Sequence, residues 1–193
     1  MNTLKTASEV QVKGKKAKEV SAELITVTTE EKNEALILIA EQLIIDQESI
    51  LGENKKDLQS GKENGLTAEV LDRIMLNEQR IQDMSEAIYL LVKLKDPVGE
   101  TIESITKENG LLINKKRVPQ GEGGMIYEAR TNVTVEEGKL SIKTGKAAKL
   151  SGRASAKDYK GSMKARMRKE IGKSGEQGEG GKREEDERRE KAK

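Results

Sequence analysis

The chain has 193 residues, of which 34% are hydrophobic and 36% are charged, enough for one ordinary domain with a thin core. It contains no cysteine and no histidine, which excludes disulfides, cysteine nucleophiles, thiolate or histidine metal sites and histidine bases, so we expect no metal. Residues 139–173 carry 12 basic and 2 acidic side chains, whereas residues 1–138 carry 18 basic and 25 acidic ones. Such segregation would suit an anion or a nucleic acid.

The first hundred residues have the spacing of a helical layer. Apolar residues three or four apart predict an amphipathic helix over residues 5–26. Thr28 and Glu31 have the spacing of a capping box, which predicts the start of a second helix over residues 30–46. Further helices are predicted over residues 46–61, 67–75 and 77–95, the last with Asn77 as its N-cap.

After Gly99 the pattern changes to short extended runs. Two strand-like runs, 101–106 and 111–118, flank Asn109-Gly110, which predicts a hairpin. A strand candidate at 125–129, a helix candidate at 133–144 and a strand candidate at 147–150 follow. We therefore predict an α/β fold with a helical first half, a hairpin and then strand and helix in alternation.

Residues 157–193 have the composition of a low-complexity charged tail. Five glycines fall in residues 172–181, and 11 of the last 12 residues are charged. Such a segment cannot bury enough apolar area to fold, so we expect it to be disordered.

One long run resembles a known enzyme family. Residues 117–135, Arg-Val-Pro-Gln-Gly-Glu-Gly-Gly-Met-Ile-Tyr-Glu-Ala-Arg-Thr-Asn-Val-Thr-Val, resemble the signature region of gamma-glutamyl phosphate reductases, which belong to the aldehyde dehydrogenase superfamily. Shorter runs fit the same family in the expected order at 12–18, 54–58, 71–73, 77–81, 96–100 and 141–145. The resemblance covers about residues 9–156 and the amino-terminal portion of the family.

The resemblance implies a domain organisation. Residues 1–156 would be a partial NADP-binding domain, made of a helical layer at 5–95, an oligomerisation-type hairpin at 100–118 and a cofactor-strand region at 119–156. The family dimerises through such a hairpin, so we expect a homodimer, a small-molecule substrate and a cytoplasmic location. The longest apolar run, 35–45, is too short to cross a membrane.

For function, the resemblance implies reduction of L-glutamyl 5-phosphate to L-glutamate 5-semialdehyde by NADPH in proline biosynthesis. In that family a cysteine thiolate attacks the acyl phosphate, and hydride then reduces the thioester. Asn132 matches the amide that donates to the oxyanion, and Arg130 also suits a substrate anion. Cofactor contacts are expected at Tyr127, Glu128, Ala129, Arg130 and, on the adenosine side, Ser151. Because the chain has no cysteine, we expect no reductase activity from it alone.

Several residues depart from the family pattern. Glu122 falls in a strand expected to be buried, Lys149 enters an apolar strand, and Ser151 replaces a basic residue. Residues 136–140 put charges on a helix that is normally rich in alanine. The glycines at 121–124 match neither a dinucleotide-binding fingerprint nor a phosphate-binding loop.

Two other functions stay open at this point. The chain could be a non-catalytic fragment or remnant with a structural, oligomerising role. It could also be a basic nucleic-acid-binding module, against which stand a single aromatic residue in 139–173, Tyr159, and the absence of a recognised binding motif.

Overall fold

The computed structural model describes residues 9–127 and 130–152, which form a mixed α/β structure. Its helices are α1 (Glu9–Leu24), α2 (Thr29–Ile45), α3 (Gln47–Glu63), α4 (Ala68–Ile74), α5 (Glu78–Lys93) and α6 (Asn132–Lys143). Its strands are β1 (Thr101–Thr106), β2 (Leu112–Lys116), β3 (Glu122–Tyr127) and β4 (Ala147–Gly152). The predicted fold class is confirmed: helices come first, then a hairpin, then a strand–helix–strand unit. The tail predicted at 157–193 lies outside the described residues.

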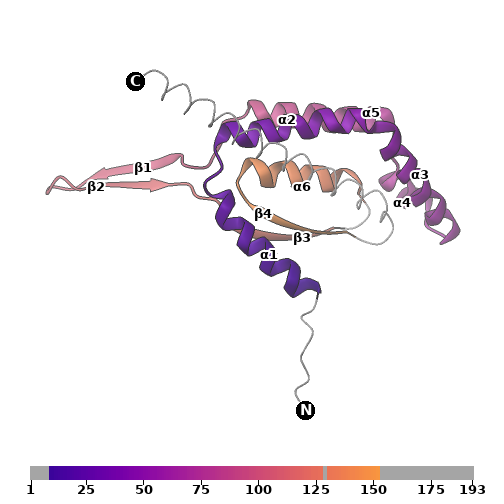
Figure 1. The fold of residues 1–193 in the computed structure, drawn as a ribbon, viewed down its shortest axis with the longest axis horizontal. Helices are drawn as coiled ribbons and strands as arrows, with labels where there is room; N and C mark the ends of the chain where they lie inside the picture. Colours follow the sequence, from indigo (N-terminus) through magenta and orange to yellow (C-terminus); the bar gives the residue numbers. More distant parts are fainter. Residues whose placement is uncertain (1–8, 128–129, 153–193) are drawn as a thin grey trace, which may run out of the picture.

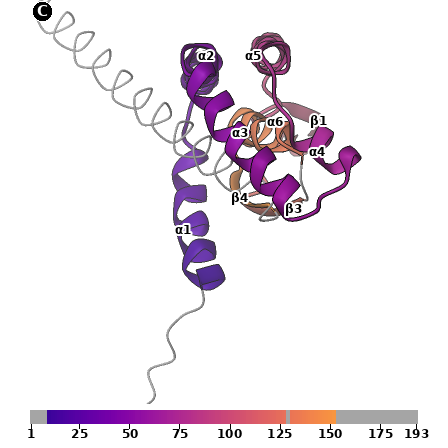
Figure 2. The same ribbon diagram turned by 90° about the vertical axis from the view of Figure 1, so that its right-hand side faces the viewer.

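The elements lie in layers, as Figures 1 and 2 show. Helices α2 and α5 run side by side in one layer, and α6 packs beneath both of them. Strands β3 and β4 lie on the other side of α6, and α1 packs against these two strands. Helix α6 is thus the central element of the second half, covered on one side by helices and on the other by strands.

The two long helices begin where the sequence predicts. The Thr28 hydroxyl accepts a hydrogen bond from the Glu31 amide at 3.2 Å, and the Glu31 carboxylate accepts one from the Thr28 amide at 2.8 Å. These bonds form the expected capping box, which satisfies amides that lack partners within the helix. At the start of α5, the Asn77 side-chain oxygen accepts from the Arg80 amide at 2.8 Å. Both predicted caps are confirmed.

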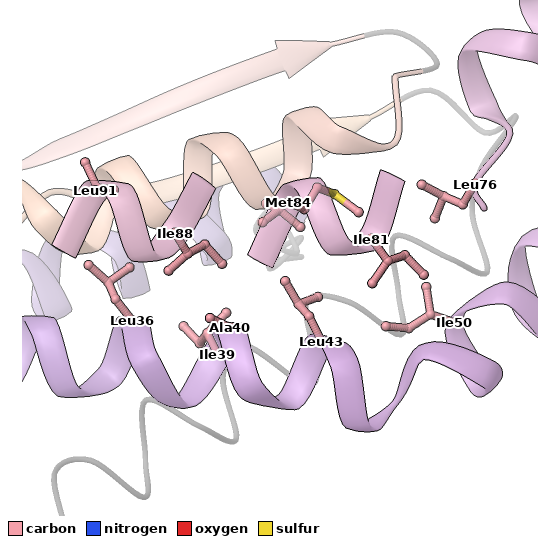
Figure 3. Close-up of a cluster of buried hydrophobic side chains, with 11 residues drawn as sticks. Leu36, Ile39, Ala40, Leu43, Ile50, Leu76, Ile81, Met84, Ile88 and Leu91 are labelled. Carbon is pink, nitrogen blue, oxygen red and sulfur yellow. The ribbon is translucent and has the colours of Figure 1, made fainter. Parts of the chain in front are cut away.

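The main core lies between α2 and α5. Figure 3 shows Leu36, Ile39 and Leu43 of α2 pointing toward Ile81 and Ile88 of α5. These side chains recur at three- and four-residue intervals, so each helix presents one continuous apolar face. The full cluster comprises Leu36, Ile39, Ala40, Leu43, Ile50, Leu76, Ile81, Met84, Ile88, Leu91 and Val135. Only Val135 comes from α6.

Strands β3 and β4 pair in parallel, with α6 as the crossover between them. The register runs from Glu122 opposite Ala147 to Tyr127 opposite Gly152. A parallel pair needs such a crossover because its strands cannot be joined by a tight turn. The expectation that Glu122 is buried is wrong: it is the first residue of β3 and its side chain is exposed. Lys149 lies half-buried in β4.

Strands β1 and β2 form an antiparallel hairpin that extends away from the layers (Figure 1). Gly110 has a φ of 83° in its turn, a conformation that glycine adopts without strain, which confirms the predicted hairpin. Every residue of both strands is exposed, including Ile102, Ile105 and Ile113. The described part of the chain therefore leaves the apolar side chains of the hairpin uncovered.

Candidate functional site

A pocket of about 400 Å³ lies where α4 and α5 face the start of α6. The α4–α5 side contributes Arg73, Arg80 and Asp83, and the α6 side contributes Arg130 and Asn132. The pocket thus brings together three arginines and the asparagine that the resemblance singled out. These residues come from segments about fifty positions apart in the sequence.

A buried asparagine fixes the wall formed by α4 and α5. Asn54 of α3 is 1% exposed. Its side-chain nitrogen donates to the Ile74 carbonyl at 2.7 Å, and its side-chain oxygen accepts from the Leu76 amide at 2.8 Å. Both groups belong to the turn between α4 and α5, where backbone groups would otherwise lack partners. Asn54 therefore holds the turn that carries the pocket arginines.

Arg80 reinforces the same turn from the other side. Its Nη1 donates to the Asp72 carbonyl at 2.8 Å and to the Met75 carbonyl at 2.6 Å. Its Nη2 also lies 3.2 Å from the Asp72 carboxylate. Most N–H groups of this guanidinium thus bond within the protein, so Arg80 stabilises the wall of the pocket.

The second wall is the first turn of α6. Asn132 is the first residue of that helix, and its side chain is exposed toward the pocket. Two residues further on, a bond of 2.6 Å joins the hydroxyls of Thr134 and Tyr127 and links α6 to the end of β3. Burial raises the pKa of Tyr127, and the bond to Thr134 offsets part of that rise. Tyr127 is therefore a neutral hydrogen-bonding group at neutral pH.

The sequence-predicted site residues fall into three groups. Asn132 and Arg130 line the pocket, and Tyr127 lies beside the start of α6 without lining it. Ser151 lies in β4 opposite Ile126. Glu128 and Ala129 lie outside the described residues. Sequence reasoning missed Arg73, Arg80 and Asp83 as pocket residues, although the first two lie in runs that carried the resemblance.

A buried group of charges lies at the opposite ends of α5 and α6 from the pocket, where the start of α2, the end of α6 and the segment after α5 meet. Lys32 and Asp96 form an ion pair of 2.9 Å, with side chains only 4% and 6% exposed. Burial alone would raise the pKa of Asp96, but hydrogen bonds from Lys32, the Val98 amide and Thr29 outweigh it and leave that pKa below its ordinary value. The carboxylate is therefore held charged.

Lys143 of α6 lies close to this pair. Its ammonium donates to the Asn33 side chain at 2.8 Å and to the Val92 carbonyl at 3.1 Å, and the residue is 2% exposed. Burial lowers the pKa of Lys143, an effect that the nearby charge of Asp96 opposes. Lys143 thus links α6 to α2 and α5, although burying its charge costs desolvation free energy.

Comparisons with known proteins agree with this geometry. No family model matches the chain. Over 149 residues, 77% of the chain and 36% of the relative, it is 55% identical to gamma-glutamyl phosphate reductase of Bacillus subtilis strain 168. The chain is 54% identical to gamma-glutamyl phosphate reductase of Bacillus anthracis, again over 77% of the chain and 36% of the relative. The resemblance to gamma-glutamyl phosphate reductases is confirmed.

Solved structures of such reductases have the same arrangement of elements. The Thermotoga maritima enzyme superposes with a TM-score of 0.83 at 38% identity, covering 86% of this chain and 40% of that one. The Saccharomyces cerevisiae enzyme gives a TM-score of 0.83 at 28% identity, covering 87% and 43%. A Listeria monocytogenes probable aldehyde dehydrogenase, 15% identical with a TM-score of 0.59, shares the fold. The chain spans about 36% of the length of the curated relatives it matches.

The described residues supply part of what a dinucleotide site needs. A nicotinamide dinucleotide needs cations or free backbone amides for its phosphates at the ends of parallel strands. Past the end of β3 the described residues offer Arg130 and the first turn of α6, which has no side-chain cap, and β4 ends at Gly152. No helix in the described ranges is long and apolar enough to cross a membrane.

Proposed function

We propose that this chain supplies part of a gamma-glutamyl phosphate reductase that converts L-glutamyl 5-phosphate to L-glutamate 5-semialdehyde with NADPH, in cytoplasmic proline biosynthesis. The observation that carries the proposal is the pocket in which Asn132 lies with Arg73, Arg80 and Arg130. Because the chain contains no cysteine, the nucleophilic thiol must come from another polypeptide segment. By itself the chain is expected to be inactive.

Asn132 would act on the oxygen of the reacting carbonyl. When a thiolate attacks an acyl phosphate, negative charge collects on that oxygen before the phosphate leaves. An amide N–H that is already aimed at this position stabilises the charge without reorganising. Asn132 forms no hydrogen bond with the described residues through its side chain, so its amide is available to a ligand in the pocket. Loss of one such donor typically lowers kcat about 10²–10³-fold.

The cofactor part of the proposal concerns the complete enzyme. NADPH supplies the hydride there, and the residues we expect beside it are Tyr127 to Arg130 and Ser151. Support comes from the parallel β3–α6–β4 unit, a supersecondary structure that commonly binds nucleotides at the ends of its strands.

Reconstitution in cells tests the proposal. The chain is co-expressed with the remaining portion of the Bacillus subtilis relative in a bacterium that lacks its own reductase, and growth without proline is scored. We expect growth with the natural chain and none with Asn132→Ala. The matched control is Asn64→Ala at the end of α3, away from the pocket, which should leave growth intact. Growth that survives Asn132→Ala, or NADPH oxidation by the purified chain alone, would contradict the proposal.

A second role is favoured by the hairpin. We propose that β1 and β2 mediate pairing with a second copy, because apolar side chains such as Ile105 and Ile113 lie opposite each other and are both 44% exposed. Exposed apolar area of this kind is typical of an interface. This role requires no catalysis, so it also fits a purely structural fragment.

Sedimentation separates pairing from a bare surface ribbon. We expect a dimer for the natural chain and a monomer for the double variant Ile105→Lys and Ile113→Lys, since two buried lysines would oppose each other at the interface. Thr101→Lys, at the base of the same hairpin, is the control and should stay dimeric. A natural chain that sediments as a monomer at all concentrations contradicts the dimer.

A further inference from the structure

The pocket beside Asn132 contains charges of both signs, and only some of them are neutralised. Within the described residues, Arg73 and Arg130 form no hydrogen bond and no ion pair. Glu69, one turn before Arg73 on α4, is fully exposed and makes no hydrogen bond to it. The pKa of Glu69 is lowered first by the Thr67 hydroxyl, and Arg73 contributes less. Among the described residues, these two guanidinium groups therefore line the pocket with no hydrogen-bonded or ion-paired partner.

The carboxylates of the pocket also differ in whether a cation of the protein neutralises them. Asp72 pairs with Arg80 at 3.2 Å, and Glu136 pairs with Lys139 at 2.8 Å. Asp83 accepts a hydrogen bond of 2.9 Å from the side chain of Gln79, a neutral group that leaves the charge in place. Once the internal pairs are set aside, the pocket offers two cations and one anion.

We propose that Arg73, Arg130 and Asp83 recognise an amino acid that bears a second anionic group at the far end of its side chain. The two arginines bind the two anionic groups, and Asp83 binds the ammonium. The proposal rests on the proposed function, because the substrate named there has this charge pattern, and it assigns the residues that would read it.

The positions of the charges support binding at two ends. Arg73 belongs to the wall that Asn54 and Arg80 hold in place, whereas Arg130 belongs to the opposite wall. An arginine fork binds a carboxylate or a phosphoryl group through two parallel hydrogen bonds. A ligand with anions at both ends can engage both walls at once.

Size and charge also exclude some ligands. A volume of about 400 Å³ is at the small end of the range usual for small-molecule sites, roughly 300–1,000 Å³. The lining holds three carboxylates, Asp72, Asp83 and Glu136, beside three arginines, so it has no excess of positive charge to attract the closely spaced phosphates of a nucleic acid. The pocket therefore suits a compact ligand that carries charges of both signs.

Titration of the purified chain, followed by the amide signals of its nuclear magnetic resonance spectrum, tests the assignment. The probes are L-glutamate, glutarate, which lacks the ammonium, and inorganic phosphate. We expect saturable shifts with L-glutamate at a Kd of about 1 mM and weaker binding of both other probes. Arg73→Gln should weaken L-glutamate binding about tenfold, whereas Arg117→Gln, on the distant hairpin, should not change it. An unchanged spectrum shows that each variant is folded.

Asp83→Asn distinguishes recognition of the ammonium from general attraction of anions. The variant should weaken binding of L-glutamate about fivefold and leave binding of glutarate unchanged or slightly stronger. Equal affinity of the natural chain for L-glutamate and phosphate would overturn the proposal, as would no saturable shift up to about 50 mM. Neither result affects the reconstitution test, which depends on Asn132. Growth without L-glutamate binding would sink this inference alone, and binding without growth would sink the proposed function alone.

Discussion

The α2–α5 pair and the β3–α6–β4 unit fill their interiors with different chemistry. Between α2 and α5 the buried residues from Leu36 to Leu91 are apolar except Ser85, whose hydroxyl donates to the Ala40 carbonyl at 3.1 Å. In α6 the buried residues are Thr134, Val135, Glu137, Lys139, Ser141 and Lys143, of which only Val135 is hydrophobic. Burial of apolar area stabilises a fold by about 25 cal/mol per Å², whereas a buried charge stabilises it only when its partners are well placed.

This difference predicts where stability resides in the molecule. The helical half should retain its packing through the hydrophobic effect, which is insensitive to pH. The half centred on α6 depends on ion pairs such as Glu137 with Lys146 at 2.8 Å, and on the position of Lys143 against α2 and α5. Substitutions at the Lys32–Asp96 pair, between α2 and α5, and on α6 should therefore change stability by different amounts.

The largest loss of stability is expected at the buried pair of Lys32 and Asp96. Asp96→Asn leaves Lys32 buried without its counter-charge, and breaking a buried pair in this way costs about 3–5 kcal/mol. Urea unfolding measures the loss. Asp72→Asn, which breaks the exposed pair with Arg80, is the matched control and should cost less than about 1 kcal/mol. Equal losses would show that the two halves are not joined through Asp96.

Asp96→Asn should also change how stability depends on pH in the acid range. The folded pKa of Asp96 lies below its ordinary value of 3.8, so the unfolded chain binds the proton first as the pH falls. The stabilisation by Asp96 is therefore complete above about pH 5 and is lost as the pH falls through the folded pKa. Unfolding midpoints between pH 5 and pH 2 should fall less steeply for Asp96→Asn than for the natural chain.

Next in size is a cavity in the apolar core. Ile88→Ala removes a side chain that is fully buried between α5 and α2, and such changes cost about 2–5 kcal/mol. Ile45→Ala, at the end of α2, removes the same atoms from a side chain that is 74% exposed. Thermal unfolding should show a large fall in Tm for the first variant and little change for the second. Similar shifts would mean that burial between α2 and α5 is not what makes Ile88 important.

The sequence predicted the helical half well because local signals and apolar periodicity agree there. The capping box at Thr28, the N-cap at Asn77 and the apolar face of α5 each specify their own element. The pocket was only partly predictable. Asn132 and Arg130 were visible through their motif, but Arg73 and Asp83 reach the site through the packing of α3 against the α4–α5 turn, which depends on the long-range bonds of Asn54. Glu122 was misjudged because the face of β3 that it shares with Gly124 and Ile126 is exposed in the described part of the chain.

A smaller effect of opposite sign is expected on α6. Lys139 is 6% exposed, and its partner Glu136 lies nearer to solvent, with a side chain 39% exposed. A buried ion pair can often be replaced by apolar residues at no cost or with a gain in stability. Here only the lysine is buried and Glu136 can stay hydrated, so Lys139→Leu should raise stability by about 1 kcal/mol. The reverse change in the other half, Leu36→Lys, should prevent folding. If Lys139→Leu also destabilises strongly, the charges of α6 are matched to their surroundings and the contrast between the halves fails.

The most subtle prediction concerns Lys143 and alkaline pH. Its folded pKa lies below the ordinary value of 10.5, so between the two pKa values the unfolded chain binds more protons than the folded one. Stability from this group therefore rises with pH across that window, as the buried ammonium loses its charge.

The contribution of Tyr127 to the pH dependence of stability has the opposite sign, because its raised pKa makes the unfolded chain lose its proton first above pH 10. The difference between the natural chain and Lys143→Met cancels the contribution of Tyr127. Urea unfolding at pH 8 and at pH 10 should show the natural chain gaining stability relative to Lys143→Met. A constant difference would mean that Lys143 stays charged in the folded protein, held by Asp96 more strongly than burial opposes it.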